Sequence, residues 1–310
     1  MKVLVYIEAK EGTPLQGSLE LLSAANGLGE ASAVAVEDTE AAKKAAEYGA
    51  KVVVLKTADT SEDAQAAALE GYIKETQPEL VLFSGSQLGK DLAPRLAQRF
   101  NAGCVTDVTV IEKSGAGVEF VRPAYGGTVL ERMSVAGSIQ FATVRSGSFA
   151  KPEAAEGSVE EKEAGVSEAV KAKIVDAAKE IAEAVDLEGA DVIVTGGRGM
   201  GDAEGFKLVE ELASLLGGVV GASRPAIEEG WASRAHQVGQ SGKIVAPKLY
   251  IACGISGQIQ HIAGMQESGI IISINNDPDA PINTIADYVI NGTIEEVVPK
   301  MIKYYKQNSK

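Results

Sequence analysis

The sequence predicts an α/β protein built from two doubly wound domains, each with a parallel β-sheet that carries helices on both faces. The chain has 310 residues, which is enough for two domains. Short β-branched apolar runs alternate with alanine-rich helical segments, as in a buried parallel sheet. A stretch rich in Glu, Ala and Gly near the middle separates two such regions, so we expect domains at residues 1–165 and 166–310.

In the first domain, short apolar runs rich in valine, isoleucine or leucine predict strands at Val3–Ile7, Ala33–Val36, Val52–Leu55 and Leu80–Phe83. The segments Glu40–Tyr48 and Ser61–Glu75 have helical composition, and Ser61 is expected to cap the second of them.

After these elements the pattern changes, because glycines leave no room for helices between the runs Val105–Glu112, Val118–Val121, Thr128–Val135 and Ile139–Val144. We expect these runs to form an antiparallel extension of the first sheet. Lys151–Gly165 has no apolar periodicity and is predicted to be an acidic, exposed and partly mobile linker.

The second domain is expected to begin with an amphipathic helix at Ser167–Val185. After this helix, the alternation of short apolar runs and helical segments resumes. It predicts strands at Val192–Thr195, Val219–Ala222, Leu249–Cys253, Ile270–Ile274 and Tyr288–Ile290, and helices at Asp202–Leu216, Gly257–Gln266 and Ile294–Lys306.

Composition and charge narrow the classes of function. The formal net charge of −14 argues against a nucleic-acid-coating protein and against docking to an anionic membrane, since both need a basic face. The two cysteines show no metal-binding spacing, and only two histidines are present, so a histidine-based metal site or a Ser-His-Asp triad is not expected. The amino terminus shows no leader pattern, and no run of about 18 apolar residues occurs. We expect a soluble cytoplasmic protein.

Three glycine-rich turns follow predicted strands of the second domain, at the sheet edge where open α/β sheets bind ligands. In the turn Thr195–Gly201, glycines would let the backbone approach a pyrophosphate and Arg198 could neutralise it, although a tight strand-to-helix turn would need the same glycines. In the turn Gly221–Pro225, Ser223 and Arg224 stand at a helix N-terminus. Arg224 is either a ligand contact or a solvated charge.

The third turn, Cys253–His261, places Ser256 where it can donate to a phosphate. His261 lies about one helical turn further on, and it is either a structural group or part of the same anion site. Two further loops, Gln237–Lys243 and Asn275–Pro278, are glycine- or turn-rich and have an ordinary surface turn as their alternative interpretation. Several polar loops at one sheet edge indicate a dinucleotide-binding domain.

Longer strings in the same loops closely resemble the alpha subunit of electron transfer flavoprotein. The strings are VGQSGK at 238–243, LYIA at 249–252, GISGQIQHIAGM at 254–265, INNDPDAPI at 274–282 and IADY at 285–288. In the first half, SGSQLGKDLAPRLA at 84–97, TDV at 106–108, RPAYGG at 122–127 and TVRSGSF at 143–149 match in the same order. The resemblance therefore covers nearly the whole chain.

This resemblance implies a heterodimer with a homologous beta subunit, and one FAD held mainly by the second domain of this chain. The first domain would form the interface with the beta subunit. The complex would carry electrons between flavin dehydrogenases, such as acyl-CoA dehydrogenases, and a downstream acceptor. It would be an electron carrier rather than a substrate-converting enzyme. The alternative within the family is an electron-bifurcating complex that oxidises NADH through a second FAD in the beta subunit.

Two further alternatives lie outside the family role. An unrelated NAD-dependent dehydrogenase would need a catalytic acid or base, which only His261 could supply. An interaction module without cofactor would not need the set Arg224, Ser241, Ser256 and His261.

The resemblance also implies the site, which has neither a catalytic residue nor a metal ligand. Arg224 would lie against the flavin ring, with Ser241 near N5 and His261 near the C2 carbonyl. The charges of the arginine and the histidine would stabilise negative charge on the ring. Ser256, Gln260 and Asn275 would serve the phosphates and the ribityl chain. The full set of FAD contacts is Arg198, Ser223, Arg224, Val238, Gly239, Gln240, Ser241, Ser256, Gly257, Gln258, Ile259, Gln260, His261 and Asn275.

Overall fold

The computed structural model of the chain describes residues 1–57, 60–115, 117–164 and 186–308. The chain divides into two compact units, Met1–Lys179 and Glu180–Lys310, which are described separately. Both the expected domain boundary at 165/166 and the helix expected at Ser167–Val185 lie outside the described residues.

The first unit contains a parallel sheet of seven strands in the order β12-β5-β4-β1-β6-β11-β7. The strands are β1 (Lys2–Tyr6), β4 (Glu30–Val36), β5 (Lys51–Lys56), β6 (Leu80–Ser84), β7 (Cys104–Val108), β11 (Gln140–Val144) and β12 (Ser158–Glu163). A small hairpin, β2 (Ala9–Lys10) and β3 (Thr13–Pro14), follows β1. The four strands predicted first in the sequence are confirmed as β1, β4, β5 and β6.

Helices cover both faces of this sheet, as a doubly wound fold requires. Apolar side chains of α1 (Gln16–Leu28) and α2 (Thr39–Ala46) pack on one face, and those of α3 (Glu62–Thr76) and α4 (Gln87–Arg99) on the other. The Ser61 hydroxyl caps α3 by accepting from the Ala64 N–H at 3.3 Å, as predicted. Neither α1 nor α4 was predicted from the sequence. No side chain caps α1, and Pro94 lies inside α4, although the Ser86 hydroxyl caps α4 by accepting from the Gly89 N–H at 2.9 Å.

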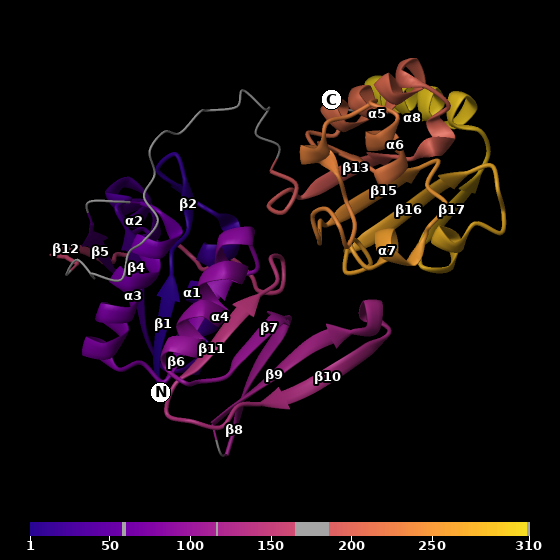
Figure 1. Cartoon of the computed structure of the whole chain (residues 1–310). Coiled ribbons are helices and arrows are strands. Elements are labelled where there is room, and N and C mark those ends of the chain that lie inside the picture. Colours follow the sequence, from indigo (N-terminus) through magenta and orange to yellow (C-terminus); the bar gives the residue numbers. More distant parts are fainter. Residues whose placement is uncertain (58–59, 116, 165–185, 309–310) are drawn as a thin grey trace. The chain divides into compact units, whose positions relative to one another are not determined.

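Two predictions for the first unit are wrong. The antiparallel strands do not extend the main sheet. β8 (Val110–Ser114), β9 (Gly117–Ala124) and β10 (Val129–Ser134) form a sheet of their own, in which β9 and β10 make a long hairpin (Figure 1). The run expected as one strand divides at Thr109 into β7 and β8, and the wholly buried β11 joins the parallel sheet.

The second error concerns Lys151–Gly165, which does not lack secondary structure. β12 within it pairs in parallel with β5 at the edge of the seven-stranded sheet. The strand is exposed and mostly charged, so it shows no apolar signal. Backbone hydrogen bonds and polar contacts hold it, among them the Thr39 hydroxyl donating to Glu161 at 2.7 Å.

The second unit has five parallel strands in the order β14-β13-β15-β16-β17. They are β13 (Val192–Gly196), β14 (Val219–Ala222), β15 (Leu249–Cys253), β16 (Ile270–Asn275) and β17 (Tyr288–Asn291), all close to the predicted ranges. Numbered along the chain, this is the order 2-1-3-4-5. β14 lies on one side of β13, whereas β15 lies on its other side. The strand order therefore reverses between β13 and β15, and their carboxyl ends form the switch point where such sheets bind ligands.

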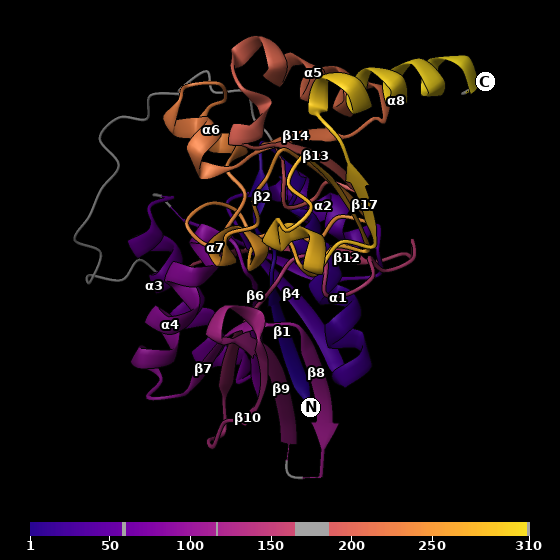
Figure 2. The same cartoon turned by 90° about the vertical axis from the view of Figure 1, so that its right-hand side faces the viewer.

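The helices of this unit are α5 (Ala203–Leu215), α6 (Arg224–Glu228), α7 (Ile259–Ile262) and α8 (Ile294–Asn308). α5, α6 and α8 pack on one face of the sheet, and α5 and α8 lie side by side (Figure 2). The other face is covered by α7 and by loops that contribute Val238, Met265 and Ile282. The helix predicted at Gly257–Gln266 is reduced to α7. Short 3-10 helices are η1 (Tyr125–Gly127), η2 (Arg198–Met200), η3 (Arg234–His236) and η4 (Pro281–Thr284).

No helix among the described residues combines the length and apolar character that crossing a bilayer would require.

Candidate functional site

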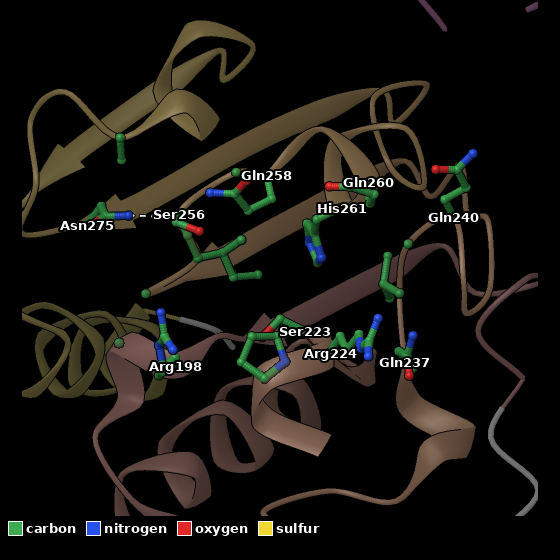
Figure 3. A pocket seen from close by; sticks show the side chains of 18 of the residues that line it. Arg198, Ser223, Arg224, Gln237, Gln240, Ser256, Gln258, Gln260, His261 and Asn275 are labelled. Atoms are coloured by element: carbon green, nitrogen blue, oxygen red, sulfur yellow. Dashed lines mark hydrogen bonds between the residues drawn. The ribbon is translucent and has the colours of Figure 1, made fainter. Parts of the chain in front are cut away.

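A cavity of about 740 Å³ opens at the carboxyl ends of β13, β14, β15 and β16, within the second unit. Its volume lies in the range of about 300–1,000 Å³ that is typical of small-molecule and cofactor sites. All the predicted contacts line it except Ile259, whose side chain is 55% exposed at the start of α7. Figure 3 shows Arg198, Ser223 and Arg224 on one side of the cavity, and Ser256, Gln258 and His261 on the other.

The lining includes residues that the sequence analysis did not assign: Gly199, Pro225, Gln237, Gly254, Ile255, Asp277 and Ala280. All but Ala280 belong to the five loops already singled out, so loop position alone was a sufficient signal for them. Ala280 stands in the loop after β16, inside the string INNDPDAPI.

The loops after β13 and β15 touch each other at the switch point. The Gly199 N–H donates to the Gly254 carbonyl at 3.0 Å, and a Cβ on Gly197 would lie only 2.2 Å from that same oxygen. Gly254 has a φ of +61°, and its own Cβ would meet the Gly199 Cα at 2.8 Å. Packing between the two turns therefore accounts for the glycine at position 197. Gly199 and Gly254 take part in the same packing and also line the cavity.

Glycines shape the loop after β15 and shorten α7. Gly257 has a φ of +84°, and a Cβ there would lie 2.2 Å from the Ile282 nitrogen. Gly264 lies against the backbone of Gly239, where an added Cβ would come within 2.4 Å of its Cα. The loop Gln237–Lys243 is therefore seated directly on the segment that carries α7. The Gln240 N–H adds a bond of 2.7 Å to the Gln260 carbonyl.

Ser223 presents an unsatisfied hydroxyl to the cavity. The residue is 7% exposed, its Oγ has no hydrogen-bond partner among the described residues, and it does not cap α6. An unmade hydrogen bond of a buried polar group costs about 1–3 kcal/mol. A ligand with a polar group at this wall would recover that cost.

The charge of the cavity wall is opposite to that of the protein. Arg198 and Arg224 line the cavity together with a single acid, Asp277, whereas the chain carries a net charge of −14. The Arg198 guanidinium forms no ion pair or hydrogen bond with any described residue, so its charge is free for a ligand. Arg224 donates through Nε to Glu228 at 2.8 Å. This wall suits an anionic ligand.

His261 is neutral near neutral pH. It is 8% exposed, and burial lowers the pKa of its imidazole to about 4, although a hydrogen bond to the Val238 carbonyl opposes the shift. The Tyr250 hydroxyl lies 2.9 Å from its Nε2. The positive charge expected of this histidine is therefore absent, and Arg198 and Arg224 are the cations of the cavity wall.

Two predicted contacts also hold the loops in place. The Asn275 amide nitrogen donates to the Ile255 carbonyl at 2.8 Å, and its oxygen accepts from the Asp277 N–H at 3.1 Å. The Gln237 amide donates to the Ser241 hydroxyl at 3.0 Å, which leaves the hydroxyl proton of Ser241 available to a ligand. No cluster of three or more metal-binding side chains occurs in the described parts of the chain.

Family models match both units. Residues 3–169 match the electron transfer flavoprotein domain, and residues 186–266 match the electron transfer flavoprotein FAD-binding domain. The second match assigns a flavin cofactor to the chain, and both matches support a role in electron transfer.

The chain is similar to several relatives over almost its full length. It is 38% identical to electron transfer flavoprotein subunit alpha of Thermoanaerobacterium thermosaccharolyticum, covering 98% of each chain. It is 38% identical to the protein of the same name from Bacillus subtilis, over 99% of this chain and 98% of the relative. A third relative is acryloyl-CoA reductase electron transfer subunit beta of Anaerotignum propionicum, which is 34% identical over 98% of this chain and 95% of its own. The chain belongs to the family of electron transfer flavoprotein alpha subunits.

Proposed function

We propose that this chain is the FAD-holding alpha subunit of a heterodimeric electron transfer flavoprotein. The complex carries electrons between flavin dehydrogenases, such as acyl-CoA dehydrogenases, and a downstream acceptor. One observation carries the proposal: the switch-point cavity combines glycine-shaped backbone, two arginines and the unsatisfied Ser223 hydroxyl in a protein that is otherwise strongly acidic. A large cofactor with a pyrophosphate fits this set of groups.

The residues fit FAD in both charge and hydrogen bonding. Arg198 and the loop Ser256–Gln260 would hold the pyrophosphate, because this wall supplies a free guanidinium, hydroxyl and amide donors, and backbone near a helix start. Ser223 would donate its unpaired hydroxyl to a polar group of the cofactor. Arg224 would lie at the ring, and Ser241 would donate to a ring nitrogen.

Bound FAD would supply an isoalloxazine ring that accepts and releases electrons one or two at a time. The chain contributes the environment of that ring. The Arg224 guanidinium stabilises negative charge that develops nearby. His261 contributes a buried, uncharged wall.

The beta subunit is the proposed partner, and the first unit is the proposed surface for it. Exposed apolar side chains lie on the antiparallel sheet of that unit, at Val110, Val129, Leu130 and Met133, and on the adjoining η1, at Tyr125. Apolar residues gathered on one exposed sheet are typical of a protein–protein contact.

The alternative is the alpha subunit of an electron-bifurcating complex that oxidises NADH through a second FAD in the beta subunit. The name of the relative from Anaerotignum propionicum supports this alternative, because it describes an electron transfer subunit of a reductase. Flavin stoichiometry and NADH oxidation separate the two functions.

The test is co-expression of this chain with its beta subunit, followed by the absorbance spectrum and the flavin content of the purified complex. The proposal expects one non-covalent FAD per heterodimer and no NADH oxidation. Two FAD per heterodimer with NADH oxidation would support the alternative. A folded, colourless heterodimer that FAD cannot reconstitute would contradict both.

A further inference from the structure

Tyr250 is a buried titratable side chain beneath the cavity that the proposed function does not use. It lies in β15, none of its surface is exposed, and it is not part of the cavity wall. Its hydroxyl oxygen is 2.9 Å from His261 Nε2, and the two rings meet edge to face at 60° with centroids 6.3 Å apart. Burial raises the pKa of this phenol well above its usual range, so the hydroxyl keeps its proton.

The partners of His261 determine where its own proton lies. The Val238 carbonyl forms a hydrogen bond with the imidazole, and a carbonyl can only accept. A ring nitrogen must therefore donate to it. Since Nε2 faces Tyr250, the donor is Nδ1, and Nε2 is left to accept the hydroxyl proton of Tyr250.

These bonds join three elements of the site. Tyr250 belongs to the sheet, His261 to α7, and Val238 to the loop Gln237–Lys243. That loop supplies Val238, Gly239, Gln240 and Ser241 to the cavity wall. A shift of His261 would therefore disturb the loop Gln237–Lys243 as well as the imidazole of His261, which lines the cavity.

We propose that Tyr250 is a positioning residue for the flavin site: its hydroxyl bonds Nε2 and so holds the His261 ring with Nδ1 as the donor, and through His261 it holds the loop against α7. The inference rests on the proposed function for its meaning in cofactor binding. The geometry of the Tyr250–His261–Val238 chain can be tested without any cofactor.

The first experiment uses the full chain labelled with ¹⁵N in its histidine rings. The chain has only two histidines, so His236 serves as the internal reference. We expect His261 to show a protonated Nδ1 and an unprotonated Nε2 at pH 7 in the wild type. In Tyr250→Phe, the Nε2 signal should shift because Nε2 loses its hydrogen-bond donor, whereas the Val238 carbonyl still favours a protonated Nδ1. A protonated Nε2 in the wild type, or an unchanged Nε2 signal in Tyr250→Phe, would overturn the proposal.

The second experiment titrates FAD into the apo-heterodimer. Tyr250→Phe should raise the dissociation constant about two- to tenfold, which is typical of losing one neutral hydrogen bond. The matched control is Tyr6→Phe, which removes a buried hydroxyl bonded to Gln65 in the first unit and should leave FAD affinity unchanged. Equal affinities in the two variants would contradict the positioning role.

The two experiments separate the inference from the proposed function. If the wild-type heterodimer does not bind FAD, the proposed function fails, while the histidine spectra still decide the tautomer. If FAD binds and the spectra show no dependence on Tyr250, only the inference fails.

Discussion

Arg224 donates through Nε to the Oε1 of Glu228, one helical turn further along α6, at 2.8 Å. Because this ion pair uses Nε, both Nη groups of the guanidinium remain outside it. Both side chains are largely exposed, at 68% for Arg224 and 60% for Glu228, so the pair itself adds little stability. It orients the guanidinium that lines the cavity, and this relationship leads to two predictions.

Arg224→Ala should lower the reduction potential of the first one-electron step of the flavin. A unit charge at about 5 Å is worth roughly 3 kcal/mol at an effective dielectric of about 20. Because about 1.4 kcal/mol corresponds to about 60 mV for one electron, the shift should be on the order of 100 mV. Spectroelectrochemical titration of the heterodimer measures it.

Arg224→Lys should retain part of the effect, since it keeps the charge and loses the planar fork. Arg234→Ala is the matched control, because Arg234 does not line the cavity. If Arg224→Ala binds FAD normally and its potential stays within about 20 mV of wild type, the assignment of Arg224 to the ring fails, since the same conversion predicts about five times that shift.

Glu228→Gln should raise the same potential by less than Arg224→Ala lowers it, because it removes the negative charge beside the guanidinium. Glu229→Gln removes a neighbouring carboxylate that does not contact Arg224, and it serves as the control. In an Arg224→Ala background, Glu228→Gln should have no further effect beyond that of the control. A full effect in that background would show that Glu228 does not act through Arg224.

Ser223→Ala should have opposite effects on the apo-protein and on cofactor binding. It removes a buried hydroxyl that has no partner among the described residues, so the free energy of unfolding of the apo-protein should stay constant or rise. FAD affinity should fall about two- to tenfold, because one hydrogen bond to the cofactor is lost. Urea unfolding and FAD titration measure the two effects, with exposed Ser214→Ala as the control. Unchanged FAD affinity would remove Ser223 from the set of contacts.

Gly257→Ala should destabilise the second unit much more than Gly201→Ala. The two glycines share a φ of +84°, but a Cβ on Gly257 would lie 2.2 Å from the Ile282 nitrogen, whereas a Cβ on Gly201 would meet nothing within 4 Å. Gly201→Ala therefore reports only the cost of the left-handed backbone, about 1 kcal/mol or more. Urea unfolding of both variants isolates the cost of the clash. Equal losses would show that the close approach to Ile282 is not required.

His261 should make the stability of the second unit depend on pH. In the unfolded chain, a histidine has a pKa of about 6.5, whereas burial lowers the pKa of His261 to about 4 in the fold. Between these values the unfolded state binds a proton that the folded state does not, so the free energy of unfolding falls as the pH drops from about 6.5 toward 4. His261→Gln removes this contribution, so its stability relative to wild type should improve over that range. His236→Gln is the control, and a constant difference between His261→Gln and wild type would contradict a neutral, buried His261.

Local signals in the sequence determined most of the second unit. The predicted strands match β13 to β17 because short β-branched runs between turn residues are typical of buried parallel strands. The cavity lies where the glycine loops were expected, because carboxyl ends of parallel strands share one sheet edge. Strings such as GISGQIQHIAGM carry the resemblance to the family in the sequence alone, independently of the fold.

Only the tertiary structure decided several other features, because they depend on residues far apart in the chain. β12 pairs through its backbone, and its charged side chains give no sign of that pairing. β11 belongs to the parallel sheet, although it follows the strands of a separate antiparallel sheet in the chain. His261 loses its charge because folding buries it against Tyr250 and the Val238 carbonyl. Desolvation and long-range backbone pairing are properties of the packed chain, and no local pattern of residues encodes them.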